Sequence, residues 1–453
     1  MKKFYLFAAA AVLLAACVKT QTLDEVTPIG ADETAVSFDV YTPRATKAGK
    51  PQEITTPILK AGPGFGVFAY YTDNGKYDQY VKPNFMYNQQ VKWNAGKWVY
   101  EPVKYWPNET GDAAKSDDID YVTFFAYAPY VHSDPATGAI RIPEDLAAQH
   151  NLNETKEQQK NIIGMINNNT MGDPKIKYVV DWDPATSVDL LWGVQSAGDG
   201  MGLPFLNQSK PKTTDSTVFN LKHALAKLNV QIDAHFDQTH DIAQNPADDS
   251  TRIYVRSITF EGFAVKGALN LNNTTKDTPL WMDYAGIDNL VAEPVTIFDG
   301  RKDGKEGQKD GEDAREKVIG LNPVIIQSVP YYDKTHLTKG VTNSMVNLFK
   351  PISDNGSEDP IFVIPNGEPV SITIVYDVET RDKSLAGYLS DGVTHGSTIE
   401  NTITWKNNGS LKMEAGKAYR ITLHLGMTTV KVNASVNAWA AEDPEWVDLP
   451  LNS

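Results

Sequence analysis

An aromatic-rich stretch, residues 85–130, constrains the fold of this chain more than any other feature. It holds twelve aromatic residues, and several alternate with other residue types, as in Lys97-Trp98-Val99-Tyr100. Aromatic and β-branched residues at this spacing are typical of the half-buried surface of a β-sheet. The run Asn94-Ala95-Gly96-Lys97 predicts a turn, so we expect a β-hairpin here. Pro102 and Pro107 end its ladder, because proline has no N–H to donate.

Composition extends this expectation to the whole chain. The 453 residues are 41% hydrophobic and 10% aromatic, with 26 Pro and 32 Gly. This composition favours an all-β protein of two domains, in which many short strands are joined by turns. The net charge of −15 disfavours nucleic acid and anionic lipid headgroups as partners. After residue 16 no run of about twenty apolar residues occurs, so we expect no membrane-spanning helix in the chain that follows.

The N-terminus has the pattern of a secretion signal. Met1-Lys2-Lys3 is basic, and residues 4–16 are apolar but too few to span a bilayer stably. The segment ends in Leu14-Ala15-Ala16-Cys17, which resembles a bacterial lipobox. In this interpretation the chain is cut between Ala16 and Cys17, and Cys17 receives acyl chains, palmitate among them. Each buried methylene contributes about 0.8 kcal/mol to anchoring. An ordinary signal peptide is the alternative, and Cys17 is the only cysteine, so no disulfide is expected.

The segment behind the signal reads as a tether followed by one strand and an exposed loop. Residues 17–34 are polar and predict a flexible tether. In residues 35–42, Val36, Phe38 and Val40 alternate with polar neighbours and predict a single short strand. Residues 43–51 are basic and flanked by prolines, which is typical of an exposed connector and of a protease-sensitive loop.

The remaining chain predicts further strands and a domain boundary. Glycines and prolines crowd residues 195–216, so we place a boundary near residue 212, between an N-terminal domain of 35–212 and a C-terminal domain of 213–453. Residues 253–260 and 264–271 predict a hairpin around Glu261-Gly262. Other apolar or alternating runs predict strands at 67–71, 188–194, 361–365, 370–378, 401–405, 419–425 and 430–439.

No pattern in the chain indicates catalysis, a metal or a cofactor. Metalloprotease, nucleophile-elbow and P-loop motifs are absent, so we expect no enzyme activity and no cofactor. Residues 62–66 are glycine-rich but precede a strand, which favours a turn over a nucleotide loop. His235 and His240 would lie on opposite faces of a strand, and His223 and His424 fit satisfied core or interface histidines. The charged loop 299–313 lacks the ligand spacing of a calcium loop.

Several short pieces, in order along the chain, resemble the fimbrillin family of Bacteroidales. These type V pilins include Mfa-like and FimB-like anchoring or accessory subunits. The matching pieces are Thr42-Pro43-Arg44-Ala45-Thr46, Phe65-Gly66-Val67-Phe68-Ala69-Tyr70, Tyr105-Trp106-Pro107, Val122-Thr123-Phe124-Phe125-Ala126-Tyr127-Ala128-Pro129, Val188-Asp189-Leu190-Leu191, Phe219 to Leu228 with His223-Ala224-Leu225-Ala226-Lys227-Leu228, and Ala415-Gly416-Lys417-Ala418-Tyr419.

The resemblance implies two tandem transthyretin-like Greek-key β-sandwich domains and a route of assembly into a fimbrium, or pilus, that supports cell adhesion. A lipidated precursor would reach the cell outer membrane, and a trypsin-like protease would cut between Arg44 and Ala45. Loss of the strand with Val36, Phe38 and Val40 would open a groove. The C-terminal strand of another fimbrial subunit would then fill this groove by donor-strand exchange. In this chain the candidate donor strand carries Val447, Leu449 and Leu451.

Alternatives remain open at this point. Pro450 would interrupt a donated strand, and Lys47 and Lys50 offer other basic cleavage sites. An anchoring accessory subunit need not be cleaved, and a tip subunit need not donate. A surface lipoprotein that binds glycans is the competing class. Its candidate stacking residues are Trp93, Trp98, Trp106, Trp281, Trp405 and Trp439.

Overall fold

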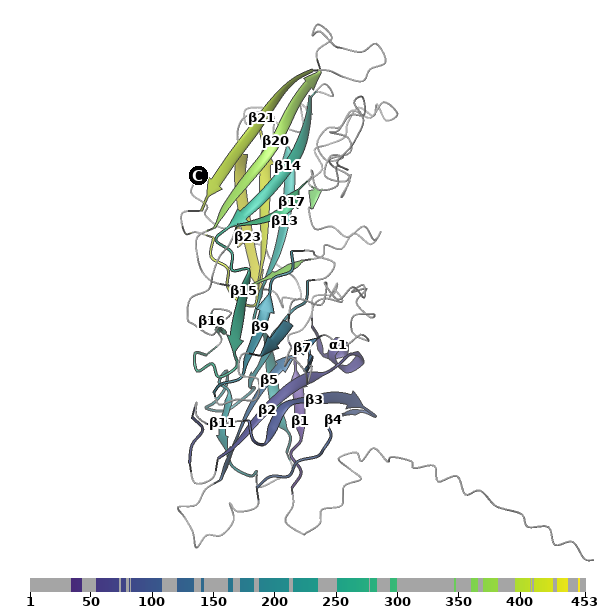
Figure 1. Cartoon of the computed structure of the whole chain (residues 1–453), viewed down its shortest axis with the longest axis vertical. Helices are drawn as coiled ribbons and strands as arrows, with labels where there is room; N and C mark the ends of the chain where they lie inside the picture. The colour runs from purple at the N-terminus through teal and green to yellow at the C-terminus, as the bar shows by residue number, and fades with distance from the viewer. Residues whose placement is uncertain are drawn as a thin grey trace, which may run out of the picture.

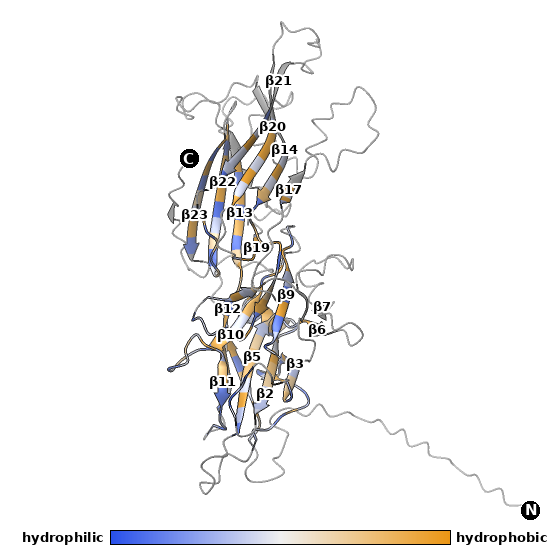
Figure 2. Ribbon diagram, turned by 60° about the vertical axis from the view of Figure 1, so that its left-hand side comes forward, coloured by the Kyte–Doolittle hydropathy of each residue, from blue (hydrophilic) through white to orange (hydrophobic). Residues whose placement is uncertain are grey.

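A computed structural model of the chain describes residues 34–42, 54–72, 75–78, 81, 83–107, 120–133, 140–141, 162–165, 172–182, 187–211, 215–234, 251–276, 278–282, 294–299, 346–347, 360–365, 370–381, 396–407, 409, 411–426, 430–438 and 447–448. Almost all regular structure in these ranges is β-strand, as the composition predicts, and the all-β class is confirmed. The strands form two groups that stack end to end along the long axis (Figures 1 and 2).

The lower group in Figure 1 is an eight-stranded sheet, which we call sheet 1. Its order is β1-β12-β10-β5-β2-β3-β4, and β11 pairs with β5. The strands are β1 Phe38–Tyr41, β2 Phe65–Thr72, β3 Met86–Asn94, β4 Lys97–Val99, β5 Tyr121–Ala128, β10 Leu191–Gln195, β11 Phe205–Gln208 and β12 Thr217–His223.

The upper group consists of two sheets that face each other (Figure 1). Sheet 2 has the order β18-β13-β22-β23-β24, with β19 also beside β13, and sheet 3 has the order β17-β14-β20-β21. The strands of sheet 2 are β13 Ala226–Ala234, β18 Val346–Asn347, β19 Ile361–Val363, β22 Lys417–Leu425, β23 Val430–Ala438 and β24 Val447–Asp448. Those of sheet 3 are β14 Thr251–Glu261, β17 Val295–Asp299, β20 Ser371–Arg381 and β21 Gly396–Lys406.

A fourth sheet joins the two groups. Sheet 4 has the order β16-β15-β9-β8, with β8 Ile162–Met165, β9 Lys175–Val179, β15 Lys266–Asn270 and β16 Leu280–Met282. A two-stranded ribbon, β6 His132–Ser133 and β7 Ile140–Arg141, completes the strands. Only Ala224 and Leu225 separate β12 in sheet 1 from β13 in sheet 2. The chain therefore passes between the two groups directly after His223, and the division into two sandwich domains remains our proposal.

Two hydrophobic cores follow from this arrangement. The first core fills the inner face of sheet 1 and takes side chains from β1, β2, β3, β4, β5, β10 and β12. The second core runs without a break from the outer face of sheet 1, through sheet 4, into sheets 2 and 3. Since β2 and β5 contribute to both cores, both of their faces are buried. This explains their continuous apolar sequences, which do not alternate.

The local predictions are confirmed in part. β3 and β4 form the expected hairpin, joined at Ala95 and Gly96, which both have positive φ. Residues 62–64 form the predicted turn before β2. Gly64 has a φ of 74°, and a Cβ there would lie 1.9 Å from the carbonyl oxygen of Val91, so only glycine fits.

The predicted hairpin of residues 253–260 and 264–271 is wrong. β14 pairs with β17 and β20 in sheet 3, whereas β15 pairs with β9 and β16 in sheet 4. Gly262 makes a turn with a φ of 87°, but the chain leaves one sheet there and enters another. Alternation identifies a strand; it does not identify the strand's partner.

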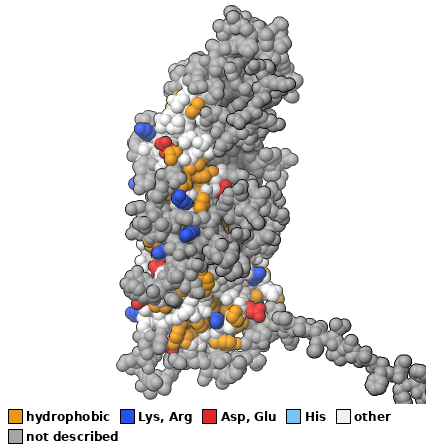
Figure 3. Space-filling view, in the orientation of Figure 1, with side chains coloured by type: hydrophobic (Ala, Val, Ile, Leu, Met, Phe, Trp, Pro, Cys, Tyr) orange, Lys and Arg blue, Asp and Glu red, His pale blue; other side chains and the backbone are white. Residues whose placement is uncertain are grey.

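The sequence did not predict the single described helix, α1 (Thr56–Ala61), which has a proline in its first turn. Among the residues that the structure describes, no helix is both long and apolar enough to cross a membrane. On the visible face, hydrophobic side chains lie among polar ones, and several gather over sheet 1 (Figure 3). Tyr41, Met201 and Leu280 are the large hydrophobic side chains that are exposed in the described part of the chain.

Candidate functional site

The candidate site is β1, the strand that the resemblance to fimbrillins implies is removable. It lies at the edge of sheet 1 and pairs in parallel with β12, with Phe38 opposite Thr217 and Val40 opposite Phe219. The ladder begins with a hydrogen bond of 2.8 Å from the Thr217 N–H to the Ser37 carbonyl. The hydroxyls of Ser37 and Ser216 lie 2.9 Å apart beside it. The predicted strand is therefore present, and it joins the sheet along one edge only.

The residues just before β1 pair with a different part of the chain. The Val36 N–H donates to the Lys104 carbonyl, and the Trp106 N–H donates to the Thr34 carbonyl, both at 2.8 Å. Residues 104–106 follow β4, the last strand in the order of sheet 1, whereas β12 lies near the other end of that order. Residues 34–41 therefore lie between the two ends of the sheet. We call the space that residues 34–41 fill, between β12 and residues 104–106, the exchange groove. Without residues 34–41, both walls of the groove would carry unpaired backbone groups.

Tyr100 lies where the segment changes from pairing with residues 104–106 to pairing with β12. Its hydroxyl donates to the Val36 carbonyl at 2.7 Å and accepts the Lys104 N–H at 3.2 Å. Burial raises the pKa of this hydroxyl above its ordinary value, so it stays a neutral donor at physiological pH. Tyr100 thus satisfies a buried carbonyl that lies between the two backbone pairings.

Three side chains of this segment enter the first core. Val36, Phe38 and Val40 are 0%, 4% and 3% exposed, whereas Tyr41 at the end of the strand is 60% exposed. The Phe38 ring centroid lies 5.5 Å from that of Tyr100, 5.7 Å from that of Phe124 and 6.0 Å from that of Phe219. The alternation in the sequence correctly identified these buried residues. It could not identify the rings that surround them.

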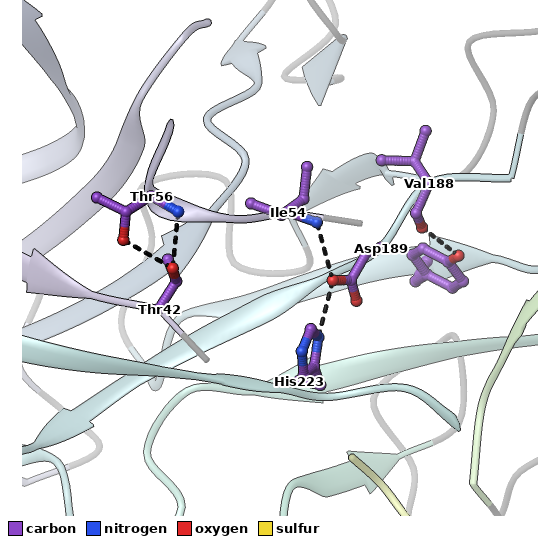
Figure 4. A network of polar contacts seen from close by, with 7 residues as sticks. Thr42, Ile54, Thr56, Val188, Asp189 and His223 are labelled. Carbon is purple, nitrogen blue, oxygen red and sulfur yellow. Dashed lines mark hydrogen bonds and ion pairs between the residues drawn. The ribbon is translucent and has the colours of Figure 1, made fainter. Parts of the chain in front are cut away.

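The chain on both sides of residues 43–53 is held by hydrogen bonds (Figure 4). On the upstream side, the Thr42 hydroxyl accepts the Thr56 N–H at 2.7 Å and lies 2.7 Å from the Thr56 hydroxyl. These contacts bring the two ends of the intervening segment together. Arg44, Ala45, Lys47 and Lys50 belong to that segment and lie outside the described residues.

On the downstream side, a buried carboxylate holds the chain independently of β1. Asp189, which is 0% exposed, accepts the Ile54 N–H at 3.3 Å and lies 2.8 Å from Nδ1 of His223 (Figure 4). Since a carboxylate only accepts, the His223 nitrogen is the donor. The side chain of Ile54 is buried in the first core. His223 is thus a satisfied buried histidine, as predicted, and Asp189 is a contributor that periodicity could not reveal.

A shallow pocket opens where β1 begins. Its volume is about 270 Å³, and Trp106, Phe205, Gln208, Asp215 and Ser216 are among its lining residues. Hydroxyl, amide and aromatic groups of this kind suit a sugar. However, Trp106 is only 5% exposed and packs edge-on against Phe124, so it offers no open ring face.

The other candidate glycan-stacking residues that the structure describes are packed as well. Trp98 and Trp281 are buried, and Trp405 packs against the second core. Trp93 meets Trp98 at an interplanar angle of 71° and is covered by the Lys60 ammonium. Trp439 lies outside the described residues. No coplanar exposed pair occurs among the described tryptophans.

The remaining predicted sites are described only in part. Backbone pairing places Val447 opposite Val436 and Asp448 opposite Ser435 at the edge of sheet 2. Leu449, Leu451, Ala16 and Cys17 lie outside the described residues, as do His235 and His240. His424 contacts the Asn433 side chain at 3.0 Å. Within the part of the chain that the structure describes, no group of three or more His, Cys, Asp or Glu side chains could hold a metal ion.

Comparison with known proteins bears on what this strand arrangement does. No family model matches the chain. Fimbrium subunit Fim1C of Phocaeicola vulgatus is 24% identical over 417 residues, which cover 83% of this chain and 96% of that protein. This chain is related to a fimbrium subunit. The resemblance to fimbrial proteins of this bacterial group, predicted from the motifs, is confirmed.

Solved structures give a weaker likeness. A fimbrial protein from Bacteroides vulgatus ATCC 8482 is 18% identical with a TM-score of 0.48, and the match covers 90% of this chain and 99% of that one. A candidate cell adhesion protein from Bacteroides uniformis ATCC 8492 is 14% identical with a TM-score of 0.34, over 90% and 98% of the two chains. The Phocaeicola vulgatus relative is named as a fimbrium subunit and not as an enzyme.

Proposed function

We propose that this chain is a subunit of a cell-surface fimbrium and that it assembles by donor-strand exchange after cleavage at Arg44–Ala45. One observation carries the proposal. The segment directly upstream of Arg44 is an edge strand whose inward side chains Val36, Phe38 and Val40 complete the first core. The relationship to a fimbrium subunit supports the same function.

The physical logic follows from what the strand covers. Loss of residues 34–41 would expose the apolar floor of the exchange groove, including the rings of Phe124 and Phe219, together with the backbone of β12. An extended strand from another subunit can supply both the missing backbone partners and the missing side chains. The contact is heterologous, so repetition gives an open fibre.

Fixed flanks allow cleavage without collapse of the rest of the sheet. Asp189 and His223 hold the chain at Ile54, and Leu59 of α1 is buried in the first core. The two hydrogen bonds of Asp189 do not involve residues 34–41, so they can hold Ile54 in place after the strand has left.

The N-terminal pattern supports export as a lipoprotein. Acylation of Cys17 would anchor the precursor in the outer membrane, with residues 17–34 as the tether. Cleavage after Arg44 would release the subunit from this anchor into the fimbrium. Its partners are then other fimbrial subunits, and its role is to support adhesion. A permanently anchored accessory subunit that escapes cleavage is the second candidate.

The test is treatment of the purified precursor with an arginine-specific protease, followed by mass determination and electrophoresis without heating. We expect cleavage of the peptide bond after Arg44. We also expect a ladder of stable oligomers, formed either by the cleaved chain alone or after a second fimbrial subunit is added. The Arg44→Gln variant should stay intact and monomeric. Arg252→Gln, which changes an arginine far from the segment, is the matched control and should behave as the wild type.

The outcomes separate the candidates. A precursor that resists cleavage at Arg44 and stays monomeric with every subunit added contradicts strand exchange and favours the anchored accessory subunit. Oligomers that form equally well with Arg44→Gln would show that assembly does not depend on this cleavage, and the proposed route would be wrong.

A further inference from the structure

The residues that fill the exchange groove show what an incoming strand must look like. The groove accepts three inward side chains at alternate positions, at present Val36, Phe38 and Val40. The two outer positions hold β-branched residues of modest size, while the central one holds an aromatic ring. Because protein interiors are close-packed, a replacement strand binds best when its side chains match these sizes.

The central position is the most demanding. Phe38 is surrounded by three rings, with Phe219 nearly parallel to it at an interplanar angle of 25° and Phe124 edge-on at 81°. The Phe219 ring also meets Phe65 and Phe205, and the Phe124 ring meets Trp106. Because these rings are packed against other rings, we expect them to close only partly around a smaller side chain.

The backbone of β1 sets a second requirement. In the parallel register, Thr217 lies opposite Phe38 and donates its N–H to the Ser37 carbonyl. The evenly spaced bonds of a parallel ladder then turn the Asp39 N–H toward the Thr217 carbonyl. The next N–H, that of Val40, points away from β12 and donates to the Asp39 carboxylate at 2.8 Å. A strand in this orientation needs an N–H at the position of Asp39.

The candidate donor segment of this same chain meets neither requirement. With Val447, Leu449 and Leu451 inward, it offers leucine where the groove holds Phe38. The same alternation places Pro450 at the position of Asp39, where it has no N–H to offer the Thr217 carbonyl. An unfilled pocket and an unpaired carbonyl both weaken binding.

We propose that the exchange groove selects a donor strand from a different subunit, one that runs parallel to β12, carries an aromatic residue at the position of Phe38 and has no proline at the position of Asp39. The inference rests on the proposed function and makes it specific, because it excludes the segment around Leu449 and Pro450 of a second copy of this chain as the preferred donor.

Synthetic peptides test the proposal on the full chain that has been cleaved after Arg44, freed of its N-terminal fragment in denaturant and refolded, so that the groove is empty. The reference is a labelled peptide of residues 34–40, which aligns position by position with residues 445–451, and its binding is followed by fluorescence anisotropy. Competing peptides are the unlabelled reference, its Phe38→Leu, Asp39→Ala and Asp39→Pro variants, and a peptide of residues 445–451. Asp39→Ala is the control for Asp39→Pro, because it removes the same side chain and keeps the N–H.

We expect Phe38→Leu to weaken binding about tenfold and Asp39→Pro to bind at least about tenfold more weakly than Asp39→Ala. The 445–451 peptide should bind about a hundredfold more weakly than the reference, since both defects combine in it. Leu449→Phe together with Pro450→Asp should recover most of this loss.

Three results would overturn the proposal. If the 445–451 peptide binds within about threefold of the reference, the groove does not discriminate against this chain's own segment. If Asp39→Pro and Asp39→Ala bind equally, the parallel orientation is wrong. If the reference peptide itself does not bind the cleaved chain, strand exchange at this groove fails and the proposed function fails with it. Equal binding of all peptides would leave strand exchange standing and refute only the selectivity.

Discussion

Phe38 offers the most direct measure of how much β1 contributes to the fold. Its side chain is 4% exposed and contacts three rings of the first core. A buried phenylalanine removes about 150–200 Å² from water, worth about 4–5 kcal/mol at 25 cal/mol per Å², and this is an upper estimate. Truncation of buried phenylalanine to alanine typically costs about 3–5 kcal/mol. We expect Phe38→Ala to lower the free energy of unfolding of the uncleaved chain by about 3–4 kcal/mol.

The assay is urea denaturation of the uncleaved chain followed by tryptophan fluorescence, which senses the first core because Trp98 and Trp106 belong to it. Tyr41→Ala is the matched control, since Tyr41 ends the same strand but is 60% exposed. It should shift the free energy of unfolding by about 0.5 kcal/mol or less. A loss below about 1 kcal/mol for Phe38→Ala would show that β1 is not part of the cooperative core and would refute the reasoning.

Two further predictions follow from the same contacts. Tyr100→Phe removes the hydroxyl that lies 2.7 Å from the Val36 carbonyl and leaves that carbonyl unpaired, so the free energy of unfolding should fall by about 1–3 kcal/mol; an unchanged urea midpoint would contradict this role. Burial raises the pKa of Tyr376 to about 12, while the same group in the unfolded chain has a pKa of about 10. Between pH 10 and pH 12 the folded chain binds more protons than the unfolded chain. The contribution of Tyr376 to the free energy of unfolding is therefore complete below pH 10 and is lost as the pH rises through 12. Urea midpoints measured from pH 8 to pH 11.5 should show this fall, and it should be smaller in Tyr376→Phe; a midpoint independent of pH would refute it.

Periodicity predicted local structure well where one face of a strand is buried. Val36, Phe38 and Val40 alternate with more exposed residues, and they are the residues that enter the first core. The hairpin of β3 and β4 follows from the same pattern together with the turn at Ala95 and Gly96. In these elements the information lies within a few neighbouring residues, so the sequence alone suffices.

Pairing across long separations was beyond the reach of such patterns. β14 and β15 are adjacent in the chain and both apolar, yet they belong to different sheets. Nothing in their alternation distinguishes a hairpin from a crossover, because both leave the same residues buried. The short helix α1 was missed for a related reason, since six residues are too few to show helical periodicity.

The sequence predicted which residues form the candidate site, but it did not predict which distant side chains contact them. The sequence places Arg44 directly after an alternating strand, which is a local feature. Tyr100, which lies 64 positions beyond Val36, and Asp189, which lies 135 positions beyond Ile54, contact the segment only because the fold brings them there. Their roles depend on geometry that no spacing rule encodes.

If the proposed assembly route is right, the depth at which β1 is buried favours its displacement by an incoming strand over its simple release after cleavage. Cleavage after Arg44 would break one covalent bond and leave the buried side chains of Val36, Phe38 and Val40 in place. Burial of such side chains stabilises by about 1.5–3 kcal/mol each, so the cut strand would stay bound for some time. An empty groove would also present an open sheet edge, which promotes aggregation. In the proposed route, a strand that stays until a better-fitting one arrives would keep this edge covered. The fit of the incoming strand would then decide whether exchange occurs.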